Sequence, residues 1–155
     1  MGGNFNGDRK LSLADGFTLL EILVAMAILT ILGAFAVPQW GNLLAKYRLD
    51  SAARHVATEL HGARNRAMAQ YRRVRLVFDS PTTYTIQKEQ TPGEKDYTAI
   101  TGSKSLPLGI TAVFNNTPVF QTRGNASPGA TITLTNANNE TKEVAVHLTG
   151  RIDIR

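Results

Sequence analysis

A carboxylate stands alone in a long uncharged stretch near the start of the chain. Residues 17–45 contain one charged residue, Glu21. In a membrane-spanning helix a carboxylate costs roughly 2.5–3.5 kcal/mol on insertion scales, so such a group normally faces a partner. If the chain is cut between Gly16 and Phe17, the new α-amine lies close to Glu21 in depth. The two groups are poorly placed within one helix but can pair between staggered neighbouring helices, and Glu21 then sets the register of assembly.

The apolar segment that carries Glu21 has the length of a membrane-spanning helix. As a helix, residues 17–38 would span about 33 Å, against a hydrocarbon core of about 30 Å. We therefore expect a transmembrane and assembly helix over residues 17–41. Two alternatives stay open. A secretory signal would be cut at the Ala-Phe-Ala site of residues 34–36, although the first sixteen residues have no net charge where such a signal starts basic. An anchor that is never cut leaves Glu21 unexplained.

The hexapeptide Gly-Phe-Thr-Leu-Leu-Glu of residues 16–21 resembles the prepilin signature of type IV pilins and type II secretion pseudopilins. The resemblance implies a leader over residues 1–16, which a prepilin peptidase removes after Gly16. It also implies methylation of the new N-terminal Phe17. Glu21 is then the residue that guides recruitment into the fibre, where the N-terminal helix packs against other pilin or pseudopilin subunits.

The apolar helix is expected to bend and then to continue into a soluble domain. Proline inside a helix removes a hydrogen bond, and membrane helices tolerate it, so Pro38 predicts a bend together with Gly33. From residue 39 to about residue 71 apolar residues recur mostly every three or four positions, which is typical of a helix that covers a core. These residues are Leu44, Tyr47, Ala52, Val56, Leu60, Ala63, Ala67 and Tyr71.

After residue 71 the pattern changes to short alternating segments rich in β-branched and aromatic residues, which favour strands. Asparagines at residues 136–139 predict a hairpin between two of them. An antiparallel sheet packed on the amphipathic helix gives an α+β fold with one globular domain over residues 42–155. The expected strands cover residues 74–79, 84–88, 110–114, 119–122, 130–135, 143–148 and 151–154.

Several loose motifs resemble, in their order, the GspH/FimT branch of minor pilins and pseudopilins. The resemblance implies a pilin fold and a non-enzymatic subunit of a type IV pilus or type II secretion system that helps to initiate or cap a fibre. It implies a single-pass protein of the bacterial inner membrane with a periplasmic C-terminal domain. Its implied partners are other subunits, the prepilin peptidase, the inner-membrane assembly platform and membrane lipid. The motifs lie at residues 63–67, 74–76, 120–124, 131–134, 144–146 and 150–152.

Basic residues suggest an alternative function, that of a DNA-binding minor pilin of a DNA-uptake pilus. The net charge of +5 permits anionic partners. Some members of this branch bind DNA through a Gly-Arg-x-Arg motif near the C-terminus, whose second arginine is replaced here by Asp153. Alternation along this last strand would place Ile152 and Ile154 in the core. The candidate contacts for double-stranded DNA are Arg151, Arg155, Arg64, Arg66, Arg72, Arg73 and Arg75.

The sequence contains no residue pattern typical of an enzyme. Gly-x-Ser-x-Gly, a phosphate-binding loop with Lys-Ser/Thr and His-Glu-x-x-His are all missing, and there is no cysteine. Glu89, Glu94 and Asp96 crowd one polar loop, for which we expect a solvated loop, with a calcium site as the alternative. We expect no catalytic residue, no cofactor and no metal ion.

Overall fold

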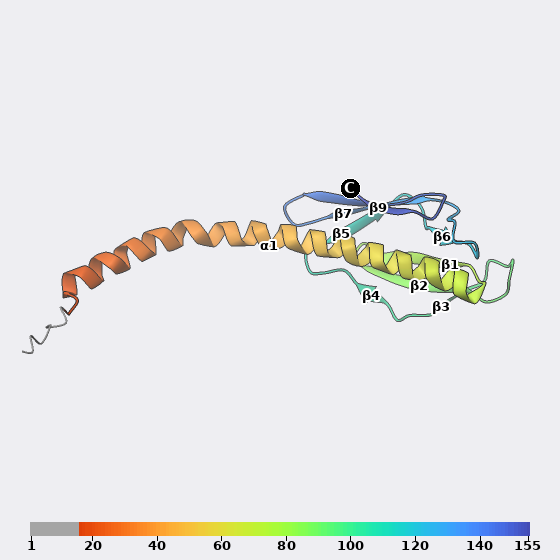
Figure 1. The fold of residues 1–155 in the computed structure, drawn as a ribbon, viewed down its shortest axis with the longest axis horizontal. Helices are drawn as coiled ribbons and strands as arrows, with labels where there is room; N and C mark the ends of the chain where they lie inside the picture. Colours follow the sequence, from red (N-terminus) through yellow and green to blue (C-terminus); the bar gives the residue numbers. More distant parts are fainter. Residues whose placement is uncertain (1–15) are drawn as a thin grey trace, which may run out of the picture. The chain divides into compact units, whose positions relative to one another are not determined.

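The structure, a computed structural model, describes residues 16–155, without the side chains of residues 35–39. The predicted leader therefore lies outside the described residues, apart from Gly16. The chain divides into two compact units, Met1–Gln39 and Trp40–Arg155. Helix α1 (Leu19–Gln70) contributes residues to both units, and all strands belong to the second (Figure 1).

Helix α1 confirms the long helix expected from the sequence, and its C-terminus has a clear local cause. Tyr71 adopts a left-handed conformation with φ 51°, and the Arg72 N–H donates to the Ala67 carbonyl at 3.3 Å. This bond is the signature of a Schellman cap, which turns the chain out of the helix. Tyr71 therefore points into solvent with 78% of its surface exposed, and its predicted place on the buried stripe is wrong.

The helical assignment runs through Gly33 and Pro38 without a break. The bend expected at these two residues stays a prediction, and the side chain of Pro38 is among those that are not described. Within the described part of the chain, no helix combines the length and the hydropathy of a membrane span.

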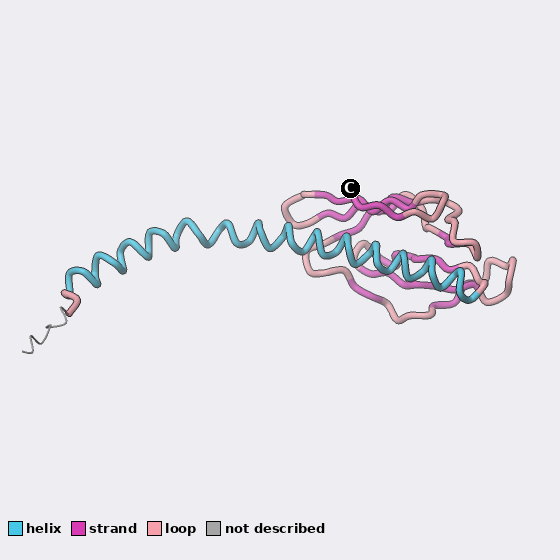
Figure 2. The backbone as a smooth tube through the Cα atoms, in the orientation of Figure 1, coloured by secondary structure: helices cyan, strands magenta, loops and turns pink. Residues whose placement is uncertain are grey.

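The strands form two antiparallel sheets rather than the single sheet expected (Figure 2). One sheet has the order β3-β2-β1-β6, with β4 also paired to β2, and the other has the order β5-β7-β8-β9. The expected strands are confirmed with small shifts, but β3 and β4 are additional, because short polar segments carry no alternation that could reveal them. The bounds are β1 (Val74–Ser80), β2 (Thr83–Glu89), β3 (Tyr97–Ala99), β4 (Lys104–Ser105), β5 (Thr111–Phe114), β6 (Val119–Phe120), β7 (Ala130–Thr135), β8 (Thr141–Val146) and β9 (Ile152–Ile154).

The predicted hairpin at residues 136–139 joins β7 to β8. Thr135 pairs with Thr141 at the end of the ladder. The buried Asn136 closes the turn, because its Oδ1 accepts hydrogen bonds from the backbone N–H groups of Asn138 and Glu140, both at 2.9 Å. Asparagine is common in loops partly because its side chain can mimic a backbone turn in this way.

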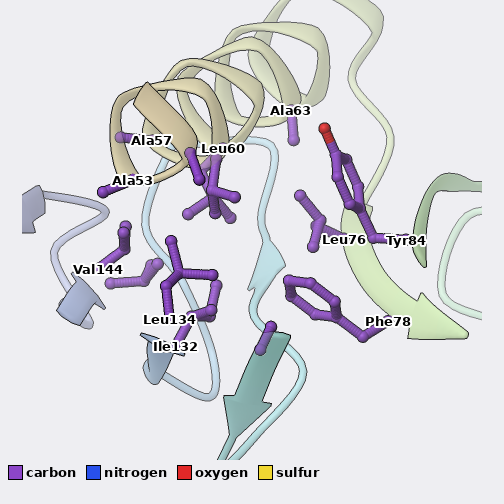
Figure 3. Packing of buried hydrophobic residues seen from close by; sticks show 14 of the residues in the cluster. Ala53, Ala57, Leu60, Ala63, Leu76, Phe78, Tyr84, Ile132, Leu134 and Val144 are labelled. Carbon is purple, nitrogen blue, oxygen red and sulfur yellow. The ribbon is translucent and has the colours of Figure 1, made fainter. Parts of the chain in front are cut away.

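The core lies where both sheets meet the second part of α1. Figure 3 shows Leu60 between two groups of side chains, one from each sheet. Leu76, Phe78 and Tyr84 come from β1 and β2 on one side. Ile132 and Leu134 of β7 and Val144 of β8 lie on the other side (Figure 3). The buried face of α1 is made largely of small residues, which let the strands approach the helix closely. Its buried members are Leu49, Ala52, Ala53, Val56, Ala57, Leu60, Ala63 and Ala67.

Besides Tyr71, three residues expected in the core or on the buried stripe are exposed. Leu44 and Tyr47 expose 50% and 63% of their surface, and Ile154 exposes 41%. The burial of α1 begins only at Leu49, because the sheets do not extend as far along the helix as its apolar periodicity does. In β9, Ile152 packs against the core as expected. Ile154 is the last residue of this edge strand and stays partly exposed.

Three of the loose sequence motifs meet at one point of the fold. Arg64 of α1 donates through Nε to the carbonyl oxygen of Gly124 at 2.7 Å. Gly124 and Gly150 are both buried and both have φ of 82°. A Cβ atom added to Gly150 would collide with the Gly124 carbonyl oxygen. Glycine is required at Gly150 both for its left-handed backbone and for this close approach.

We expect Gly150→Ala to destabilise the domain more than Gly109→Ala. Gly109 has nearly the same φ, 81°, but a Cβ there meets nothing within 4 Å. Left-handed backbone alone costs a non-glycine residue about 1–2 kcal/mol, and the forced backbone shift at Gly150 adds about 1–3 kcal/mol. Urea unfolding of both variants measures the difference. Equal losses of unfolding free energy would contradict the close contact.

A buried ion pair ties the segment between α1 and β1 to the end of β2. Arg73 donates through Nε to Glu89 Oε1 at 2.7 Å and through its backbone N–H to Oε2 at 3.2 Å. The Gly93 N–H also donates to Oε1 at 3.0 Å. Glu89 is only 2% exposed, so it is not one of the solvated loop carboxylates that we expected. The hydrogen bond from the Arg73 side chain lowers the pKa of Glu89 although burial opposes this, and the pKa of Arg73 is raised.

This pair predicts a dependence of stability on pH. Because the folded-state pKa of Glu89 is lowered, its stabilisation is present above the unfolded value of about 4.3 and is lost as the pH falls through the folded value. Glu89→Gln should therefore flatten the acid side of the stability curve, measured by urea unfolding between neutral and acidic pH. Glu94→Gln, at an exposed site, should keep the native slope. An unchanged slope in Glu89→Gln would contradict the assignment.

Arg73→Met should lower the free energy of unfolding by about 3–5 kcal/mol at neutral pH, because it leaves a buried charge unpaired.

Candidate processing and assembly site

The predicted cleavage site lies directly ahead of α1. Gly16 and Phe17 have no regular secondary structure, and Phe17 is 80% exposed. A Cβ atom added to Gly16 would meet nothing within 4 Å, so the described structure does not itself require glycine there. The peptide bond between the two residues is accessible, as a protease substrate must be.

Thr18 caps the helix that follows this bond. Its Oγ1 accepts a hydrogen bond from the Glu21 N–H at 3.2 Å, and its carbonyl accepts the Ile22 N–H at 3.2 Å. A threonine followed three residues later by glutamate is the sequence pattern of a capping box. This role of Thr18 was not predicted, although the Thr-x-x-Glu spacing indicates it. The cap fixes the start of the helix two residues after the predicted cleavage site.

Glu21 lies in the first turn of α1, where the partial positive charge of the helix N-terminus favours an acid. Its surroundings are apolar, because it lines an open groove along the helix with Phe17, Ile22 and Ala25. None of the ion pairs formed among the described residues includes Glu21. The carboxylate is thus available to a cation from outside the described residues.

Four of the seven arginines predicted to contact DNA make structural contacts on or near α1 and β2. Arg64 binds the Gly124 carbonyl, and Arg73 pairs with Glu89. Arg72 donates to the Gln90 carbonyl at 2.7 Å. Arg75 donates to Gln87 Oε1 at 2.9 Å and lies 3.9 Å from the centre of the Tyr97 ring. These guanidinium groups are used by the fold itself.

The two C-terminal arginines are more exposed. Arg151 is bound to Asp153 Oδ2 at 2.6 Å, and His147 Nε2 lies 2.9 Å from the same oxygen. Burial acts to raise the pKa of Asp153, but the hydrogen bonds from Arg151 and His147 outweigh it, and the pKa is lowered. Arg155 is exposed and pairs with Glu143 through its backbone. Asp153 therefore offsets the positive charge of Arg151, and DNA binding stays a prediction.

Arg66 is the remaining member of the predicted set. It is partly buried, and its Nη1 atom has no hydrogen-bond partner among the described residues.

Within the described residues, no group of three or more histidine, aspartate or glutamate side chains is arranged to hold a metal ion. In the polar loop for which a calcium site was the alternative, Glu89 pairs with Arg73, and Asp96 accepts the Thr91 N–H at 3.1 Å.

Comparisons with known proteins match the two units separately. Residues 12–37 match the family model of the prokaryotic N-terminal methylation motif. Residues 52–150 match the family model of the type II transport protein GspH. The first match contains Gly16, Phe17 and Glu21, and the second contains the meeting point of Arg64, Gly124 and Gly150.

Relatives and solved structures agree with these matches. A fimbrial protein of Pseudomonas aeruginosa is 26% identical over 129 residues, which cover 80% of each chain. The fold is similar to that of the minor pseudopilin EpsH from the type 2 secretion system of Vibrio cholerae, with a TM-score of 0.59 and 12% identity over 70% of this chain and 96% of that one. It is also similar to that of the type IV minor pilin FimU of Pseudomonas aeruginosa, with a TM-score of 0.58 and 17% identity over 71% and 90% of the two chains.

The GspH family model matches residues 52–150, which are more than half of the chain. It covers α1 from Ala52 onward and every strand except β9, so the similarity extends over most of the core. The α+β arrangement expected from the sequence is therefore confirmed as a pilin-like fold. The chain belongs to the GspH family.

Proposed function

We propose that this protein is a minor pilin or pseudopilin, a structural subunit of a type IV pilus or of a type II secretion system. One observation carries the proposal. An exposed Gly16–Phe17 bond precedes a capped helix, and the Glu21 carboxylate in the first turn has no ion-pair partner among the described residues. This arrangement lies within the N-terminal methylation motif of a chain that also carries a GspH domain.

The processing step is hydrolysis of the Gly16–Phe17 bond by a prepilin peptidase, followed by methylation of the new α-amine of Phe17. Hydrolysis releases the leader with Gly16 as its C-terminal carboxylate. The apolar run of residues 17–41 holds the subunit in the inner membrane, and the domain of residues 42–155 lies in the periplasm. The methylation motif over residues 12–37 supports membrane anchoring of this kind.

The assembly step pairs Glu21 with the N-terminal amine of a neighbouring subunit. In an apolar environment the two charges attract more strongly than in water, and each needs a partner. The pair forms only at one axial stagger, so it selects the register of helix packing. The assembly platform of the inner membrane then receives the subunit, which helps to initiate or cap a fibre.

Glu21→Gln keeps the shape of the side chain and removes its charge. We expect normal cleavage but a reduction of incorporation into fibres by about tenfold or more, because a charge-assisted hydrogen bond contributes about 1.5–3 kcal/mol. Immunoblots of purified fibres and of membranes measure the two quantities. Glu143→Gln, an exposed carboxylate of the domain, is the matched control and should assemble normally. Normal incorporation of Glu21→Gln would rule out the register role.

Gly16→Leu should leave an uncut precursor in the membrane, because a bulky side chain then occupies the position before the cleaved bond. The described structure leaves room for the side chain, so the block concerns the peptidase and not folding. Gly33→Leu, where a Cβ atom also meets nothing within 4 Å, should still be processed. Intact mass and N-terminal sequencing distinguish the products. A mature chain beginning at Phe17 in Gly16→Leu would refute the cleavage assignment.

A further inference from the structure

Four large apolar side chains of α1 remain exposed where the second unit begins. Trp40, Leu43, Leu44 and Tyr47 expose 72%, 50%, 50% and 63% of their surface. They line one open groove together with Gly41. Their spacing of three and four residues places them on one face of the helix. Leu49, which is only 2% exposed, belongs to the opposite face that contacts the core.

A loop from elsewhere in the domain presents another apolar side chain at the same end. Leu108 is 82% exposed and lies in the turn that the Ile110 N–H closes on the Pro107 carbonyl at 3.1 Å. The next strand begins with Thr111 paired to Thr135, the last residue of β7. The β7–β8 turn that follows Thr135 contacts α1, where Asn138 Nδ2 donates to Asn42 Oδ1 at 3.2 Å. Figure 2 shows this turn and the loop ahead of β5 at the same end of the domain.

Cations flank this apolar surface. Lys46 and Arg48 of α1 are exposed, and the nearby Asp50 is paired with Lys142 of β8. The hydrogen bond from Lys142 lowers the pKa of Asp50, so the pair keeps its charges and they offset each other. Glu140 is the other carboxylate of the turn and accepts a hydrogen bond from Asn136 Nδ2 at 2.8 Å. The Asn136 amide is neutral and leaves the charge of Glu140 in place, so Lys46, Arg48 and Lys142 exceed Asp50 and Glu140 by one positive charge at this end.

We propose that this end of the domain, defined by Trp40, Leu43, Leu44, Tyr47 and Leu108 with Lys46 and Arg48, binds the phospholipid headgroup layer before assembly. The inference rests on the proposed membrane anchoring. Along a helix, Trp40 lies about 35 Å from Phe17, just beyond a hydrocarbon core of about 30 Å. Tryptophan and tyrosine favour that boundary, and lysine and arginine reach from it to lipid phosphates.

The rival occupant is a helix from a second copy of this chain. That helix would cover the apolar face of α1, but it does not account for Leu108, which belongs to a loop of the domain. A headgroup layer contacts both elements at once, because it surrounds the helix and meets the end of the domain. The domain would then be held against the membrane surface until the subunit is incorporated.

The composition of the chain makes the proposal directly measurable. Trp40 is the single tryptophan, and there is no cysteine, so one introduced thiol can be labelled alone. The full chain would be reconstituted in vesicles of phosphatidylcholine and phosphatidylglycerol at three to one. Leu108→Cys carries an environment-sensitive dye, and Leu148→Cys is the matched control. Leu148 is an exposed leucine, at 65%, beyond the opposite end of β8.

Lipids brominated near the headgroup should quench both Trp40 and the dye at Leu108, and should do so more than lipids brominated near the chain end. The dye at Leu148 should stay unquenched. Equal quenching of the two dyes, or none at Leu108, in chains that float with the vesicles would overturn the proposal and leave the membrane anchoring intact. Chains that do not float with the vesicles would refute the anchoring itself. Quenching of Trp40 that falls as the protein-to-lipid ratio rises, with none at Leu108, would assign the groove to a second copy.

Discussion

Both sheets bury their apolar faces against one surface, the alanine-rich side of α1. Ala52, Ala53, Ala57, Ala63 and Ala67 are all nearly or fully buried. Because these side chains are short, strands from two separate sheets approach the same helix closely, and Leu60 fills the space between them. The packing density of a protein interior leaves little room for change at such positions. The helix is therefore the element that sets where each sheet lies in the second unit.

The charged groups of the chain fall into two classes that follow from this packing. Arg64, Arg73 and Glu89 complete the fold, because they satisfy backbone groups or each other where the chain turns away from α1. Glu21 forms no ion pair within the part of the chain that the structure describes, and it lies in an apolar groove of the other unit. A carboxylate with no ion-pair partner among residues 16–155, on a helix with an exposed apolar surface, suits an intermolecular pairing. Likewise, Arg73 forms an ion pair inside the fold, whereas Lys46 and Arg48 at the start of the domain form none among the described residues.

Local signals in the sequence predicted most elements correctly. The helical period, the alternating segments and the asparagine-rich turn are properties of neighbouring residues, and they predicted α1, the longer strands and the β7–β8 hairpin. Periodicity identifies a helical face but not how far another element covers it, so Leu44 and Tyr47 were expected to be buried. The division into two sheets was also missed, because strand pairing depends on residues far apart in the chain. β3 and β4 are too short and too polar to show a pattern.

The sequence by itself indicated the methylation motif of residues 12–37, because the roles proposed for Gly16, Phe17 and Glu21 depend on their order along one short peptide. The sequence also indicated the family, because several motifs that are individually loose occur in the order typical of that family. Only the tertiary structure decided which arginines serve the fold, because Arg64 meets Gly124 and Gly150 from distant parts of the chain. It alone placed Leu108 at the same end of the domain as Trp40. Contacts of this kind depend on the packing of two sheets on one helix, which no local pattern encodes.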